Sequence, residues 1–146
     1  METDVLADLG ADSPGGFLSI FELGLIHSED APFQQGQIRN PPYPNAELAA
    51  LRSVHGLTRN TVTGDDRGIR RWEALHNTIQ IETMEGAAFY YVCQMEKLPC
   101  IQIRGISNYI EIRNRENWKL DEALASVRGW LNQFLQNIAD PKAKSM

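Results

Sequence analysis

The sequence Thr83-Met84-Glu85-Gly86-Ala87-Ala88 decides how this chain is interpreted, because it marks the passage from a predicted strand, residues 79–82, into a predicted helix. It places the Glu85 carboxylate at a helix N-terminus, where the partial positive charge of the helix favours it. The next predicted strand, residues 101–106, ends just before the amide of Asn108. A carboxylate that binds two hydroxyls, beside an amide that binds a purine edge, suits a nucleoside.

Strands and helices alternate around this stretch, from Asn45 onward. The predicted elements are a helix capped by Asn45 with Leu48, Leu51 and His55 on one face, a strand at 57–63, a helix at 66–76, a strand at 79–82, a helix at 84–96, a strand at 101–106 and a helix at 120–138. This alternation is typical of a parallel sheet with right-handed crossovers, in which ligands bind outside the carboxyl ends of the strands. The predicted fold class is therefore α/β with a mostly parallel sheet.

The front of the chain, residues 1–44, shows little regular periodicity. Residues 13–16 predict a turn and residues 40–44, with three prolines, predict a rigid linker. Between them, residues 17–25 favour a short helix or a buried loop.

Composition limits the classes of function. The 146 residues fit one domain, 1–146, and 42% of them are hydrophobic, which is enough for a core. A formal net charge of −5 argues against nucleic acid or an anionic membrane as partner. The two cysteines, Cys93 and Cys100, predict buried free thiols, and the three scattered histidines indicate no metal site. With no signal peptide and no long apolar run, a cytoplasmic location is expected.

A family resemblance rests on two motifs. Residues 82–88, then Pro99, then Arg104-Gly105-Ile106-Ser107-Asn108, resemble the Met-Glu-x-Ala and Arg-x-Ile-Ser-Asp/Asn signature of the nucleoside phosphorylase and nucleosidase superfamily. The run 103–118, with the stretch 114–119, is similar to the futalosine hydrolase subgroup of the menaquinone pathway, and so are residues 8–11 and 17–25.

The resemblance implies a three-layer fold and an enzyme without a cofactor. The implied reaction is hydrolysis of the N-glycosidic bond of a 6-oxopurine nucleoside, futalosine giving hypoxanthine and dehypoxanthine futalosine. It also implies a homo-oligomer in which a neighbouring subunit helps close the pocket. Family members are usually well over two hundred residues long, so the chain is expected to match the C-terminal two-thirds of the family domain. The remaining part would carry the water-activating acid or the phosphate ligands. Its absence would expose a sheet edge and apolar surface.

The candidate site residues follow from the same motifs. The catalytic candidates are Glu85, which would accept hydrogen bonds from the ribose hydroxyls, and Asn108, which would donate to purine N7 or to a 6-oxo group. The substrate-binding candidates are Thr83 and Met84 of the first motif, with Met84 against the sugar, Ser107 orienting Asn108, and Asp65 near the base-binding turn. Each has a structural alternative: a first-turn carboxylate, a core methionine, a turn former or a strand-ending turn.

Other functions remain open on the sequence. The superfamily also contains purine nucleoside phosphorylases and methylthioadenosine or adenosylhomocysteine nucleosidases, and the phosphate ligands that separate phosphorolysis from hydrolysis would lie outside this chain. A different class is a shortened domain that binds a nucleoside or a protein partner without turnover.

Overall fold

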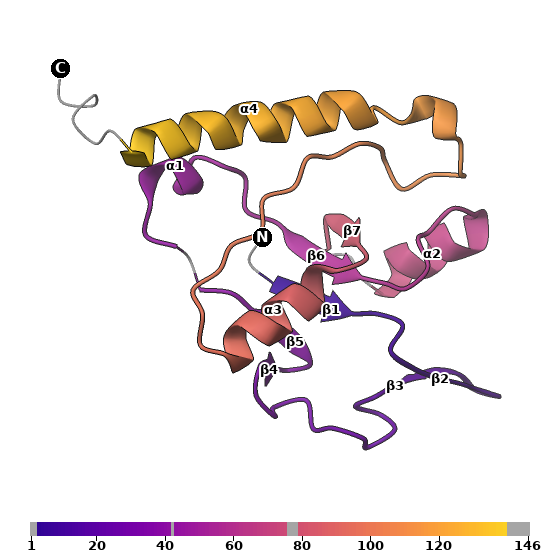
Figure 1. The fold of residues 1–146 in the computed structure, drawn as a ribbon. Coiled ribbons are helices and arrows are strands. Elements are labelled where there is room, and N and C mark those ends of the chain that lie inside the picture. The colour runs from indigo at the N-terminus through magenta and orange to yellow at the C-terminus, as the bar shows by residue number, and fades with distance from the viewer. Residues whose placement is uncertain (1–2, 42, 76–78, 140–146) are drawn as a thin grey trace.

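The computed structural model describes residues 3–41, 43–75 and 79–139, with backbone alone for 71–75 (Figure 1). Its main sheet has five strands in the order β4 (Phe33–Gln34), β5 (Gln37–Arg39), β1 (Thr3–Leu6), β6 (His55–Thr58) and β7 (Ile81–Thr83). Strands β1, β6 and β7 pair in parallel. Strand β5 pairs antiparallel with β1 on one side and with β4 on the other. Helices lie between and after the strands of this mixed sheet, and the α/β fold class is confirmed.

The parallel part of the sheet is built as the sequence predicts. Helix α2 (Asp66–Leu75) connects β6 to its neighbour β7, and α3 (Gly86–Met95) follows β7 directly. Strand β6 begins two residues before its predicted start and ends at Thr58, and β7 is displaced by one to two residues. The predicted end of α2 at His76 lies outside the described residues.

Helix α3 covers β1, β5 and β6 (Figure 1). Its residues Ala87 and Tyr90 are fully buried against Ile38 of β5 and Phe33 of β4. Burial of a large apolar side chain such as Ile38 or Phe33 stabilises a fold by about 1.5–3 kcal/mol. Desolvation at this position raises the pKa of the Tyr90 hydroxyl. The core therefore holds the start of α3, and Glu85 with it, firmly on the sheet.

The expectation of an irregular front is wrong, because residues 3–39 contain five strands, including the central strand β1. Residues 17–25 are neither helix nor buried loop: β3 (Gly16–Ser19) pairs with β2 (Gly10–Ser13) as a hairpin, followed by turns. These strands are two to four residues long, too short to establish a period. Strand β1 also buries the polar residues Thr3 and Asp4, which hides its apolar pattern.

The predicted N-cap Asn45 is confirmed, since its Oδ1 accepts from the backbone N–H of Glu47 (2.9 Å) and of Leu48 (3.2 Å). The helix that it caps, α1 (Ala46–Ala49), is only one turn long. The predicted face that continues through Leu51 to His55 is therefore wrong. Pairing with Thr3 of β1 draws His55 into β6 instead.

The predicted strand at 101–106 is also wrong for the described structure, in which these residues join no sheet. A strand needs a neighbour to bond its backbone, and no described strand lies beside this segment. The short 3₁₀ helix η1 (Arg115–Asn117) and the long helix α4 (Leu120–Ala139) follow, the latter as predicted.

Helix α4 lies over residues 101–107 and reaches α1 at its far end (Figure 1). A Cβ on Gly105 would lie 2.6 Å from the carbonyl oxygen of Ala123, so the two backbones are in close contact. Asn137 donates to the Glu47 carboxylate at 3.2 Å. Within the described residues, no helix is long and apolar enough to cross a bilayer.

Candidate functional site

Glu85 is the N-cap residue of α3, which confirms the predicted carboxylate at a helix N-terminus. Its side chain makes no capping hydrogen bond and is 74% exposed. Oε2 lies 3.7 Å from Nη1 of Arg104, from the second motif of the sequence. The carboxylate is therefore available at the surface, with a cation beside it.

Two threonines hold the backbone that carries Glu85. The Thr58 Oγ1 accepts from the backbone N–H of Ala87 (2.8 Å), and the Thr83 Oγ1 accepts from that of Gly86 (3.1 Å). The two hydroxyls lie 3.1 Å apart, and both threonines are buried. Side chains from β6 and β7 thus bind the first free N–H groups of α3 and fix the turn between β7 and the helix.

Asp4 of β1 binds one of these threonines through its carboxylate. The Thr58 hydroxyl donates to Oδ1 of Asp4 at 2.7 Å, while Oδ2 has no hydrogen-bond partner among the described residues. The side chain is fully buried, and desolvation raises the pKa of its carboxyl to about 6, against the lowering effect of the bond from Thr58 and of the more distant Arg104. Sequence reasoning missed Asp4, whose only signal is a carboxylate inside a short apolar run.

Arg104 and Gln102 connect the second motif to the same helix start. Arg104 donates to Oε1 of Gln102 at 2.8 Å, and Gln102 donates through Nε2 to the carbonyl oxygen of Gly86 at 2.7 Å. Arg104 was not among the candidate residues, although it opens the Arg-Gly-Ile-Ser-Asn motif. Its position four residues before Asn108 was the available signal.

Asn108 lies at the far end of this motif. Ser107 donates to Oδ1 of Asn108 at 2.7 Å, the contact that the predicted orienting role requires. The Asn108 amide donates to the carbonyl oxygen of Tyr109 at 2.9 Å, so one donor is used within its own loop. The backbone of Ser107 is held in turn by the N–H of Lys119 at 2.8 Å.

The turn at 63–65 carries the remaining candidate, Asp65, whose Oδ1 accepts from the backbone N–H of Gly68 at 2.6 Å in the first turn of α2. The carbonyl of Gly64 accepts from the N–H of Arg113 at 2.9 Å, so this turn lies beside the chain that follows Asn108. The 63–65 turn and the chain after Asn108 therefore meet at one edge of the sheet.

Glu82 is a carboxylate at this edge that the site prediction did not include. Its two oxygens accept from the Thr63 backbone N–H (2.7 Å) and hydroxyl (2.6 Å), and Nη1 of Arg59 lies 3.6 Å away. The Glu82 side chain is 7% exposed. With both oxygens occupied, it fixes the 63–65 turn on β7 and leaves Glu85 as the accessible carboxylate of the motif.

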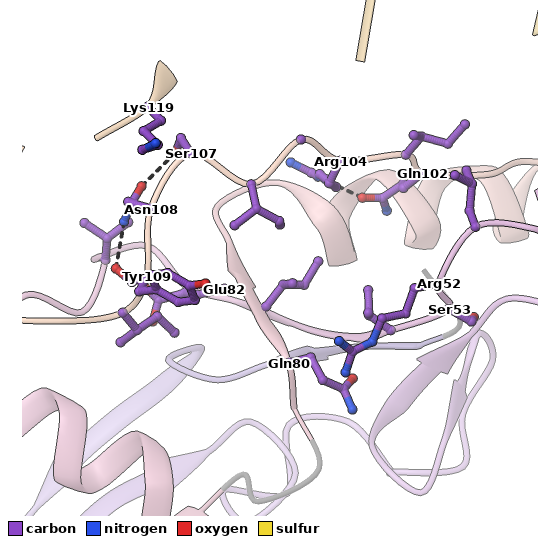
Figure 2. A pocket seen from close by; sticks show the side chains of 18 of the residues that line it. Arg52, Ser53, Gln80, Glu82, Gln102, Arg104, Ser107, Asn108, Tyr109 and Lys119 are labelled. Carbon is purple, nitrogen blue, oxygen red and sulfur yellow. Dashed lines mark hydrogen bonds between the residues drawn. The ribbon is translucent and has the colours of Figure 1, made fainter. Parts of the chain in front are cut away.

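A cavity of about 1270 Å³ lies between β7 and residues 101–111 (Figure 2). Of the six candidates, Ser107 and Asn108 line it, and Glu82 and Arg104 line it as well. Thr83, Met84, Glu85 and Asp65 are not among its lining residues. The volume exceeds the 300–1,000 Å³ typical of small-molecule pockets.

The two cysteines are free, as predicted, but only half-buried. Burial, with a hydrogen bond to Cys93, raises the pKa of the Cys100 thiol to about 11. The described residues contain no group of three or more His, Cys, Asp or Glu side chains placed to hold a metal ion.

Comparison with known proteins identifies relatives by sequence alone, since no family model and no solved structure matches the chain. Futalosine hydrolase of Streptomyces coelicolor is 31% identical over 124 residues, which are 83% of this chain and 49% of the relative. The enzyme of the same name from Acidothermus cellulolyticus is 31% identical over 81% of this chain and 48% of its own length. That of Thermus thermophilus is 31% identical over 64% of this chain and 43% of its own length.

The α/β fold carries a Met-Glu turn at the start of α3 with the Arg-Gly-Ile-Ser-Asn segment against it, the two motifs on which the resemblance to the nucleoside phosphorylase and nucleosidase superfamily rests. By sequence, the chain is similar to three futalosine hydrolases of that class. The chain spans about half the length of these curated relatives.

Proposed function

We propose that this chain is part of a nucleosidase that hydrolyses the N-glycosidic bond of futalosine, releasing hypoxanthine in menaquinone biosynthesis. The observation that carries the proposal is the exposed Glu85 carboxylate at the start of α3, held beside Arg104. The similarity to three futalosine hydrolases supports the same reaction.

The role proposed for Glu85 is to accept hydrogen bonds from the ribose 2′- and 3′-hydroxyls. Positive charge grows on the sugar as the bond to the base breaks, and bonds to a charged acceptor strengthen with it. Such an acceptor must not reorganise during the reaction. The bonds from Ala87 and Gly86 to the two threonines meet this requirement, because they fix the backbone on which Glu85 stands.

The role proposed for Asn108 is selection of the base. Its neutral amide can donate to N7 or O6 of hypoxanthine, where negative charge accumulates as the base leaves. The Ser107 hydroxyl donates to the amide oxygen of Asn108 and so orients the side chain, and the NH₂ group is the part that would donate to a base. Binding of a base requires that the donor now on the Tyr109 carbonyl be exchanged for the purine.

A non-catalytic role, binding a nucleoside without turnover, is the second candidate. One observation favours it: Met84, Glu85 and Asp65 do not share a cavity with Asn108 in this chain. In this alternative the chain would bind futalosine and release no base.

The test measures release of free base from futalosine, inosine and adenosine by chromatography, with binding measured by calorimetry. We expect release of hypoxanthine and preference for the 6-oxopurine nucleosides. Asn108→Asp should shift that preference toward 6-aminopurines, since aspartate supplies an acceptor for the adenine amino group. Binding without base release would favour the second candidate, and equal rates on all three nucleosides in both proteins would reject the role of Asn108.

A further inference from the structure

Residues 101–106 have the side-chain alternation of a β-strand without the strand's partner. Gln102 and Arg104, two residues apart, both reach the start of α3, one through the Gly86 carbonyl and the other through Glu85. Successive side chains of a strand point to opposite faces, so this period of two is the strand pattern. No strand in the described part of the chain pairs with the segment.

Strand β7 is the second incomplete element. It is the last strand of the sheet and bonds to β6 on one side, which leaves its other edge open in the described structure. The cavity of Figure 2 lies between this strand and residues 101–111. Strand β7 and residues 101–106, which join no sheet in the described structure, therefore face a common space.

The walls of this space are apolar and exposed. Six cavity-lining side chains are each at least 36% exposed: Tyr43, Leu51, Val62, Ile101, Ile106 and Tyr109. Helix α4, which covers the same segment, exposes a further apolar stripe along one side, formed by Leu120, Leu124, Leu131, Leu135 and Ile138. Exposed apolar side chains gathered in this way are typical of surfaces that bind another polypeptide, a membrane or a ligand.

The length of the relatives indicates what that polypeptide is. The chain matches 49% of the Streptomyces coelicolor futalosine hydrolase, so about half of that protein has no counterpart here. We propose that the cavity between β7 and residues 101–111 is the seat of an extended strand from that other half of the domain. The strand enters alongside residues 101–106 and packs beneath α4.

The dimensions suit this occupant better than a small ligand. A strand that pairs with the six residues 101–106 is about 20 Å long, and its backbone groups bond to an exposed strand edge as in β-strand addition. A cavity of about 1270 Å³ exceeds the space that a nucleoside needs. With the strand in place, the remaining space beside Ser107 and Asn108 is reduced toward the size of a ligand pocket.

The experiment mixes the purified chain with a separately produced polypeptide, the part of the Streptomyces coelicolor futalosine hydrolase that this chain does not match. Association is measured by calorimetry, and hydrogen exchange reports the backbone amides of residues 101–106 and of β7. We expect saturable binding, and at least tenfold slower exchange of these amides in the complex. No nucleoside is present, so the result is independent of the proposed activity.

Two matched variants locate the contact. Ile106 lines the cavity and is 59% exposed, whereas Ile112 is 62% exposed and does not line it. Ile106→Asp should weaken binding at least tenfold, and Ile112→Asp should leave it unchanged. Since both side chains are exposed, neither variant should change the fold, which circular dichroism verifies.

Three outcomes overturn the proposal. The first is no binding at micromolar concentration by a chain with intact secondary structure. The second is binding that leaves the amides of residues 101–106 unprotected. The third is self-association of the chain that already protects these amides and is lost in Ile106→Asp, which would assign the seat to a second copy.

Discussion

The start of α3 and the segment 101–111 lie side by side, but their hydrogen bonding differs. At the start of α3, threonines from two strands bind the backbone N–H groups, and a buried carboxyl anchors one of the threonines. Residues 101–106 touch the same helix through Gln102 and Arg104 but belong to no sheet, and Ile106 beside Ser107 is 59% exposed. The start of α3 is therefore one half of the candidate site and is completed within this chain. The segment 101–111 is the other half, which the proposed partner strand would complete.

The largest effect should come from the completed half. Glu85→Gln removes the charge that is proposed to stabilise the transition state, and loss of one such preorganised contact costs about 10²–10³ in rate. We therefore expect turnover of futalosine to fall by at least that factor. Because the side chain is 74% exposed, the fold should be unaffected.

Glu96→Gln is the matched control, since Glu96 is the C-cap of the same helix and is also exposed. It should retain the full rate. Equal rates in wild type and Glu85→Gln would remove Glu85 from the mechanism and leave the helix N-terminus with a structural role alone.

The buried carboxyl of this half gives the next largest effect. Its pKa of about 6 in the folded chain lies above the ordinary value of 3.8, so the folded state binds the proton more tightly. The stability that this provides is complete below pH 3.8 and is lost as the pH rises through 6. The shift of about two pKa units corresponds to about 3 kcal/mol.

Asp4→Asn removes this titration. The difference in unfolding free energy between pH 4 and pH 7.5 should change by about 2 kcal/mol relative to wild type, in the direction that favours the variant at pH 7.5. Urea unfolding at the two pH values measures it. Asp12→Asn, in the exposed β2–β3 hairpin, should leave the difference as it is in wild type. If Asp4→Asn left this difference in unfolding free energy unchanged, the Asp4 carboxyl would not be buried as described.

The same contrast explains what could be predicted from the sequence. The Asn45 cap, helices α2, α3 and α4, and the place of Glu85 depend on neighbours within a few residues, and these predictions are confirmed. The threonine network was not predicted, since Asp4 and Thr58 are 54 residues apart and neither carries a local signal. The strands of the front were missed because pairing across the sheet, and not a periodic pattern, creates them.

The strand predicted at 101–106 is the opposite case, since here a local pattern is present and the pairing is not. The segment was predicted as a strand and forms none in the described residues, although Gln102 and Arg104, two residues apart, both contact the start of α3. What sequence could not supply is the neighbour that turns such a pattern into a strand. Local signals therefore predict a strand's side-chain directions, whereas its membership of a sheet depends on another part of the domain.

The smallest predicted effect tests whether residues 101–106 can move away from α4. A Cβ on Gly105 would lie 2.6 Å from the Ala123 carbonyl oxygen and 2.8 Å from Cγ2 of Val127, so Gly105→Ala forces the segment and α4 apart. Overpacking costs about 1–3 kcal/mol in a core. Because no described strand holds residues 101–106, we expect the lower end, about 1 kcal/mol, measured as a lower thermal midpoint.

Gly129→Ala is the control on α4, since a Cβ there meets nothing within 4 Å. It should stabilise the chain by about 0.5–1 kcal/mol, because alanine is the better helix former. If the partner strand fills the cavity, residues 101–106 can no longer move. The cost of Gly105→Ala should then rise toward about 3 kcal/mol in the complex. The gain from Gly129→Ala should stay the same. An equal cost of Gly105→Ala with and without the partner would show that residues 101–106 are already rigid, and the contrast between the two halves of the site would fail.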